Sequence, residues 1–144
     1  MQPVLLVEDD PLDADLVRDT ISRLSLVNLV DVATSAKMAR MYLSRITPTL
    51  IISDVHLPGE NGIELLHWVR SQASPLCDVP VIMLTVSTNQ LHQMHAFALR
   101  ALLFLNKPIE KDVLLHALRG LDLLVTETPR GRLLSMKPRQ SAAL

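Results

Sequence analysis

Short apolar runs alternate with amphipathic segments along most of the chain, and this alternation restricts the possible folds more than any other feature. Four apolar runs lie at residues 4–7, 50–53, 81–84 and 102–105, and a weaker run lies at 26–32. Apart from Ser53, the four runs are continuously apolar rather than alternating, which is typical of strands that are covered on both faces of a parallel sheet. The sequence therefore predicts four buried strands and a fifth strand at an edge.

The segments between these runs have the spacing of helices with one apolar side. We expect helices at about residues 12–24, 36–46, 63–73, 88–99 and 110–124. Asp10 is a predicted N-cap because Pro11 follows it at the first helical position, and Ser35 is a predicted cap of the second helix. Five strand and helix units in strict alternation favour an α/β fold with a doubly wound sheet and right-handed crossovers.

The size and composition of the chain fit one globular domain. Of its 144 residues, 49% are hydrophobic and 20% are charged, which excludes wholesale disorder, collagen and coiled coils. The net charge of −1 predicts no overall attraction to nucleic acid or to a membrane. Cys77 is the single cysteine, which excludes an internal disulfide and favours a reducing compartment. With no signal sequence and no run of roughly 20 apolar residues, we expect a cytoplasmic protein.

The last part of the chain differs in character from the rest. The pattern of apolar runs stops at Thr126, and the residues from there onward contain four basic side chains and one acid. We therefore expect the domain to span residues 1–125 and residues 126–144 to form a mobile basic tail. Four positive charges without an aromatic side chain are typical of a solvated terminus, so nucleic acid is not an expected partner.

Polar residues follow the apolar runs at the points where the predicted strands end. These residues are Glu8, Asp9 and Asp10 after the first run, Asp54 after the run at 50–53, Thr85 after the run at 81–84, and Asn106 with Lys107 after the last run. In an open parallel sheet, ligands bind beyond the carboxyl ends of the strands. The sequence therefore predicts one pocket that holds at least two carboxylates, a hydroxyl and an ammonium group.

This set of groups suits phosphoryl chemistry with a divalent cation. Two carboxylates about 4 Å apart repel each other by roughly 4 kcal/mol at an effective dielectric constant near 20, and a divalent cation relieves that repulsion. A few carboxylate ligands, with room for water and a phosphate, suit Mg²⁺ better than zinc. A carboxylate can then accept a phosphoryl group while the ammonium and the hydroxyl stabilise its oxygens.

Four motifs at these positions resemble those of response-regulator receiver domains. They are VEDD followed by proline, SDVHLPGENG, MLTVS and FLNKP, and the resemblance covers roughly residues 3–122. It implies a flavodoxin-like fold with five helices and a five-stranded parallel sheet in the order 2-1-3-4-5. It also implies a single-domain regulator, similar to the chemotaxis regulators, that is phosphorylated on an aspartate.

The resemblance assigns a role to each residue of the pocket. Asp54 corresponds to the phospho-acceptor, and Mg²⁺ is bound by Glu8, Asp9, Asp54 and the backbone carbonyl of His56. Thr85 corresponds to the hydroxyl that binds the phosphoryl group, Lys107 to the pocket lysine, and Phe104 to the aromatic residue that changes rotamer on activation. Asp10 is foremost a helix cap.

The chain departs from the family pattern at positions that bear on switching. Arg100 stands where the family often has glycine, and Val86 replaces a small residue after the threonine. Methyl groups at Val86 are expected to narrow the space into which Thr85 and Phe104 move. Phe104 has no hydroxyl, so it can change position but cannot donate the hydrogen bond of a tyrosine.

The implied function is that of a receiver in a two-component system. A sensor histidine kinase or a phosphotransfer protein donates the phosphoryl group, and a downstream protein binds the face formed by the last two helices and the strand at 102–105. A homodimer is compatible with this interpretation. The chain promotes only its own phosphorylation and dephosphorylation, so it is not expected to be an enzyme with turnover.

Two other functions stay open at this point. An aspartyl-phosphate phosphohydrolase needs a second acid two residues after its nucleophile, and His56 at that position argues against one. A receiver-like module that binds partners without phosphorylation is the other alternative. Nucleotide binding is not expected, since the four glycines of the sequence form no nucleotide-binding motif.

Overall fold

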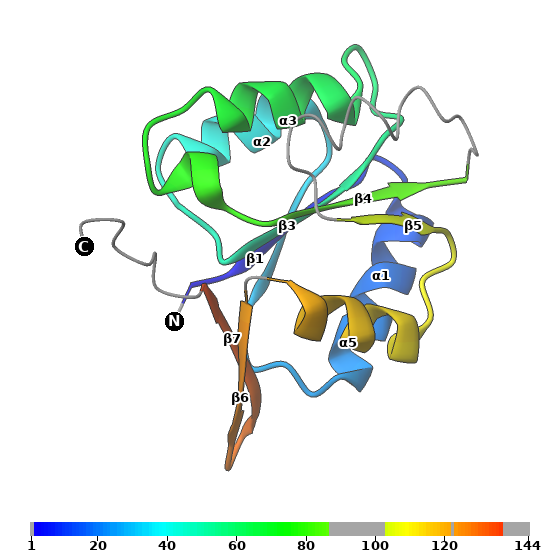
Figure 1. The fold of residues 1–144 in the computed structure, drawn as a ribbon. Coiled ribbons are helices and arrows are strands. Elements are labelled where there is room, and N and C mark those ends of the chain that lie inside the picture. Colours follow the sequence, from blue (N-terminus) through cyan, green and yellow to red (C-terminus); the bar gives the residue numbers. More distant parts are fainter. Residues whose placement is uncertain (1, 87–102, 122, 137–144) are drawn as a thin grey trace.

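The computed structural model describes residues 2–86, 103–121 and 123–136 (Figure 1). Its main sheet has five strands, all paired in parallel, in the order β2-β1-β3-β4-β5. The strands are β1 (Val4–Val7), β2 (Val30–Ala33), β3 (Leu50–Asp54), β4 (Val81–Thr85) and β5 (Leu103–Asn106). This confirms the α/β class and the predicted strand order 2-1-3-4-5.

Helices cover both faces of the sheet (Figure 1). Helices α1 (Pro11–Arg23) and α5 (Lys111–Gly120) lie on one face, and α2 (Ala36–Leu43) and α3 (Gly62–Arg70) lie on the other. A short 3-10 helix, η1 (Leu76–Asp78), precedes β4. The described residues therefore contain four of the five expected helices, and the one expected at 88–99 lies outside them.

Two predicted helix caps are confirmed. The Asp10 carboxylate accepts a hydrogen bond of 2.9 Å from the backbone N–H of Leu12 at the start of α1. The Ser35 hydroxyl accepts one of 3.1 Å from the backbone N–H of Met38 in α2. Each cap satisfies a backbone donor that has no partner within the first turn of its helix. The start of α1 is thereby fixed directly after the acidic end of β1.

The alternation of side chains along the strands divides the core into two layers. Leu5, Val7, Ile51 and Met83 pack with residues of α2 and α3. Val4, Leu6, Ile52 and Leu84 pack with residues of α1 and α5. All residues of β1, β3 and β4 are buried, because both faces of these strands are covered. This explains why their sequences are apolar apart from Ser53 and the polar residues that end β3 and β4.

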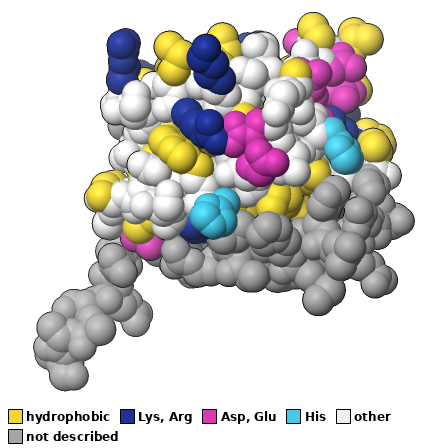
Figure 2. Space-filling view, turned by 90° about the horizontal axis from the view of Figure 1, so that it is seen from above, with side chains coloured by type: hydrophobic (Ala, Val, Ile, Leu, Met, Phe, Trp, Pro, Cys, Tyr) yellow, Lys and Arg dark blue, Asp and Glu magenta, His cyan; other side chains and the backbone are white. Residues whose placement is uncertain are grey.

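The outer face of α2 and α3 carries mixed side chains. In Figure 2, basic, acidic, histidine and hydrophobic side chains are interspersed over this face. The exposed hydrophobic side chains of α2 are Met38 and Met41. None of the helices in the described residues is both long enough and apolar enough to cross a membrane.

Residues 123–136 form a β-hairpin, whereas we expected a mobile tail from Thr126 onward. Strand β6 (Leu123–Thr128) pairs in antiparallel fashion with β7 (Gly131–Met136). Leu123 and Leu134 are buried against the layer formed by α1 and α5. The prediction of a mobile segment over residues 126–136 was therefore wrong, because apolar side chains on both strands reach the core.

The hairpin is held to the segment between α1 and β2 by backbone hydrogen bonds and by one buried side chain. The backbone N–H of Arg132 donates to the backbone carbonyl of Ser25 at 2.7 Å, and the carbonyl of Arg132 accepts from the backbone N–H of Val27 at 2.8 Å. The Asn28 amide accepts from the backbone N–H of Leu134 at 2.7 Å and donates to its carbonyl at 2.9 Å. Asn28 is buried, so these bonds replace those it would make with water.

Gly62 allows the start of α3 to pack directly against the end of β3. A Cβ atom at Gly62 would lie 2.2 Å from the backbone oxygen of Asp54 and 2.8 Å from Cε of Met83. The backbone N–H of Gly62 donates to the Val55 carbonyl at 2.7 Å, which holds the two segments together. The loop between them runs beside the candidate site, so this close approach helps to fix the position of Asp54.

We predict that Gly62→Ala destabilises the protein by about 1–3 kcal/mol, since the backbone of Asp54 must shift to admit the methyl group. Urea unfolding at equilibrium measures this loss. Gly120→Ala is the matched control, because a Cβ there meets nothing within 4 Å. It should leave stability unchanged or raise it slightly. Equal stability of Gly62→Ala and wild type would contradict the packing described here.

Candidate functional site

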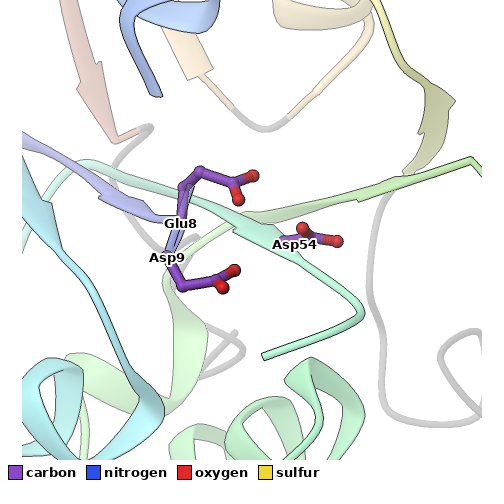
Figure 3. Close-up of side chains that lie close together, drawn as sticks. All are labelled: Glu8, Asp9 and Asp54. Atoms are coloured by element: carbon purple, nitrogen blue, oxygen red, sulfur yellow. The ribbon is translucent and has the colours of Figure 1, made fainter. Parts of the chain in front are cut away.

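Three acidic side chains meet at the carboxyl ends of β1 and β3. Glu8 and Asp9 directly follow β1, and Asp54 is the last residue of β3, the neighbouring strand. A ligand oxygen from each carboxylate lies within 4.8 Å of the others. Figure 3 shows the three side chains directed into the same region beside the sheet. The strand order therefore brings together acids that are about 45 positions apart in the sequence.

The three carboxylates differ in their exposure to solvent. Glu8 is buried, with a side chain that is only 1% exposed, and the Asp54 side chain is 10% exposed. Asp9 is exposed. A buried carboxylate is costly unless it is paired or hydrogen-bonded, so Glu8 and Asp54 depend on partners in the protein. Asp9 is accessible from solvent.

Lys107 supplies the positive charge of the site. It follows β5, and its Nζ lies 2.7 Å from Oε2 of Glu8 and 2.8 Å from Oδ2 of Asp54. Its third partner is Oδ2 of Asp13 in the first turn of α1, at 3.0 Å. An ammonium group has three N–H donors. The three carboxylates therefore use the full donor capacity of Lys107.

The electrostatics of the site follow from this arrangement. Burial raises the pKa of Glu8 above its ordinary value, and the charge of Asp54 adds to that effect while the hydrogen bond from Lys107 opposes it. Burial alone would lower the pKa of Lys107. Its hydrogen bonds to Asp54, Glu8 and Asp13 outweigh burial and hold that pKa above its ordinary value. Lys107 is therefore positively charged at every physiological pH.

Backbone groups orient the two buried carboxylates. The backbone N–H of His56 donates to Oδ1 of Asp54 at 3.0 Å, while Oδ2 accepts from Lys107. The backbone N–H of Asp10 donates to Oε1 of Glu8 at 3.2 Å. Both oxygens of each carboxylate thus have a partner. The loops that follow β1 and β3 fix the directions in which these acids point.

Thr85 and Phe104 lie on neighbouring strands at the same side of the sheet. Thr85 ends β4 and is 2% exposed. Phe104 pairs with Met83 in the sheet register and packs against the core layer beneath α2 and α3. Strand alternation places Thr85 on the side of Met83 as well. The two side chains therefore share one face of the sheet.

The donor set of the acidic cluster fits a hard divalent cation. Three carboxylates at this spacing offer the oxygen ligands that Mg²⁺ prefers, and the exposure of Asp9 leaves access for water and a phosphate. Relief of the repulsion between Glu8 and Asp54 would favour binding. The part of the backbone carbonyl of His56 in such a site stays a prediction.

Val86 and Arg100 are two residues at which the chain departs from the family pattern. Val86 is 75% exposed, so most of its side chain lies in solvent and does not fill the space next to Thr85. Arg100 lies outside the described residues. Sequence reasoning missed Asp13 as a partner of Lys107. The position of Asp13 in the first turn of α1 is only a weak indication of this contact, since many helices carry an acid in their first turn.

The chain matches the family model for the response regulator receiver domain over residues 4–119. The regulatory protein VanRB of Enterococcus faecalis is 33% identical over 118 residues, which cover 82% of this chain and 51% of VanRB. The transcriptional regulatory protein GltR of Pseudomonas aeruginosa is also 33% identical over 118 residues, covering 82% of this chain and 48% of GltR. The chain spans about half the length of these two relatives.

Solved structures of response regulators have the same fold. The bacteriophytochrome response regulator RtBRR superposes with a TM-score of 0.77 at 32% identity, covering 90% of this chain and 84% of RtBRR. The chemotaxis response regulator CheY4 of Vibrio cholerae superposes with a TM-score of 0.72 at 29% identity, covering 83% of this chain and 98% of CheY4. With the acidic cluster at the expected edge of the sheet, these matches show that the chain belongs to the response regulator receiver domains of two-component signalling.

Proposed function

We propose that the chain is a phosphorylation switch in which Asp54 accepts a phosphoryl group from a sensor histidine kinase or a phosphotransfer protein. The observation that carries this proposal is the contact between Lys107 Nζ and Oδ2 of Asp54 at 2.8 Å, beside two further carboxylates. A lysine in this position can stabilise negative charge on a phosphoryl group attached to Asp54. Such signalling takes place in the cytoplasm, where we expect this protein to act.

The transfer requires few groups from the protein. A carboxylate oxygen of Asp54 forms a bond to phosphorus while the P–N bond of the phosphohistidine breaks, and the imidazole nitrogen leaves with the electron pair. Lys107 and the hydroxyl of Thr85 donate hydrogen bonds to the phosphoryl oxygens. The backbone N–H of His56 holds Asp54 in place through Oδ1. Positioning and charge stabilisation account for most of the catalysis in reactions of this type.

The acidic cluster has a defined part in this proposal. The carboxylates of Glu8, Asp9 and Asp54 would hold Mg²⁺, as the number and type of their oxygens suggest, with the backbone carbonyl of His56 proposed as a further ligand. When bound, Mg²⁺ supplies positive charge that offsets the carboxylates and the phosphoryl oxygens. Asp9, which is exposed, can move toward the ion at little cost.

Phosphorylation would be transmitted through Thr85 and Phe104. A phosphoryl group adds about −1.5 to −2 charges and three acceptor oxygens, which is enough to attract the Thr85 hydroxyl. Movement of Thr85 would then change the space that is available to Phe104, which packs on the same face of the sheet. We infer that a downstream protein binds near β5 and α5 and distinguishes the two states. Phe104 changes position without forming a hydrogen bond of its own.

We predict that acetyl phosphate with Mg²⁺ adds one phosphoryl group to wild type and none to Asp54→Asn, because the amide is a much poorer nucleophile than the carboxylate. Mass spectrometry of the intact proteins measures this. Asp15→Asn, which removes an exposed acid from α1, is the matched control and should be phosphorylated like wild type.

Each other outcome excludes the proposal in a distinct way. An equal mass gain in wild type and Asp54→Asn would move the acceptor to another residue. The absence of a gain in both would favour a module that binds partners without phosphorylation. Release of many equivalents of phosphate per protein would favour a phosphohydrolase.

We predict that Mg²⁺ stabilises wild type, since an ion that binds only the folded state shifts the unfolding equilibrium. At ten times its Kd, the melting temperature should rise by roughly 3–7 °C. Asp9→Asn should lose most of this rise, because one of three carboxylate ligands becomes neutral. Asp15→Asn should retain it. Thermal unfolding with and without Mg²⁺ measures the effect, and an unchanged rise in Asp9→Asn would exclude Asp9 as a ligand.

A further inference from the structure

Asp13 is a third partner of the pocket lysine. We propose that it is a positioning residue, which holds one N–H of Lys107 in the unphosphorylated protein and yields it to a phosphoryl oxygen on Asp54. This inference rests on the proposed function, because it assumes that Asp54 is phosphorylated. The observation behind it is the contact of 3.0 Å between Lys107 Nζ and Oδ2 of Asp13.

The donor count of Lys107 makes an exchange of partners necessary. Its three N–H groups are used by Glu8, Asp54 and Asp13 at 2.7, 2.8 and 3.0 Å. A phosphoryl group on Asp54 adds three acceptor oxygens at the same place. Lys107 can donate to one of them without losing a bond to Glu8 or Asp54 only if it releases Asp13.

Asp13 is the partner that is least costly to release. Its side chain is 37% exposed, compared with 1% for Glu8 and 10% for Asp54. Water can replace the lysine at an exposed carboxylate, whereas a buried carboxylate would be left without a partner. The contact with Asp13 is also the longest of the three. Release of Asp13 therefore costs much less than release of Glu8.

The surroundings of Asp13 agree with this role. Asp13 and Lys107 both line a groove of about 480 Å³, together with Leu16, Thr20 and Ile109. The groove gives a released Asp13 carboxylate access to water. Asp13 also lies in the first turn of α1, where an acid favours the helix by a small amount. Its removal should therefore lower stability only slightly.

Asp13 opposes the phosphorylated state in two ways. It competes with the phosphoryl oxygens for Lys107, and its negative charge repels theirs. In Asp13→Ala both effects disappear, and one N–H of Lys107 is available before the phosphoryl group arrives. In Asp13→Asn the repulsion disappears, and the neutral amide oxygen is a weaker competitor for Lys107 than the carboxylate. These variants should bind a phosphoryl group on Asp54 more tightly than wild type.

The test uses beryllofluoride, which forms a tetrahedral mimic of a phosphoryl group on a carboxylate. The full chain is titrated with beryllofluoride in the presence of Mg²⁺, and binding is followed by ¹⁹F NMR. We expect Asp13→Asn and Asp13→Ala to bind it about 2- to 5-fold more tightly than wild type, in keeping with the small contribution of a partly exposed ion pair. Asp15→Asn, with the same change of charge on the same helix, should bind like wild type.

The other outcomes separate this inference from the proposed function. If wild type binds beryllofluoride and the Asp13 variants bind it equally well or more weakly, Asp13 is not a displaceable partner and the inference is wrong. If wild type binds no beryllofluoride and gains no mass with acetyl phosphate, the proposed function fails and the inference fails with it. A purely structural role of Asp13 would lower the melting temperature without tightening binding.

Discussion

The ion pairs of Lys107 with the carboxylates at the ends of β1 and β3 are the interaction on which the site depends. Glu8 and Asp54 are nearly buried, and their charges would repel each other if no cation lay between them. Lys107 provides that cation from a third strand end, at 2.7 and 2.8 Å. One lysine that bonds two buried acids is sensitive to phosphorylation, because a phosphoryl group would change the charge at Asp54 and offer Lys107 new acceptor oxygens in place of Asp13.

The parallel sheet makes this arrangement possible. Because β1, β3, β4 and β5 are consecutive neighbours, their carboxyl ends bring acids, a threonine and a lysine to one edge. The sheet is covered by apolar side chains on both faces, and the polar groups lie at the ends of the strands and in the short loops that follow them. Gly62 and the backbone N–H groups of Asp10 and His56 then set the directions of the carboxylates. The apolar sheet stabilises the fold, whereas the groups that phosphorylation would affect lie at the carboxyl ends of its strands.

Much of the fold and the core of the site could be predicted from the sequence, since both depend on periodicity and strand ends. The apolar runs marked the strands, and Asp54 and Lys107 stood where two of those runs stopped. The hairpin was missed because its charges suggested a solvated tail, although apolar residues such as Val125 and Leu134 lie on both of its strands. The contact of Asp13 with Lys107 was missed because it depends on where the first turn of α1 lies relative to the residue that follows β5, which no local pattern specifies.

The central claim is that the carboxylate of Asp54, and no other, accepts the phosphoryl group. Borohydride reduces an aspartyl phosphate to homoserine, whereas it leaves an ordinary carboxylate unchanged. After treatment of the protein with acetyl phosphate and Mg²⁺, borohydride reduction and peptide sequencing by mass spectrometry identify the acceptor. We expect homoserine at position 54 alone. Homoserine at position 9 or 13, 5-hydroxynorvaline at position 8 (the reduction product of a glutamyl phosphate), or no reduced residue in a protein that has gained phosphate would contradict the claim.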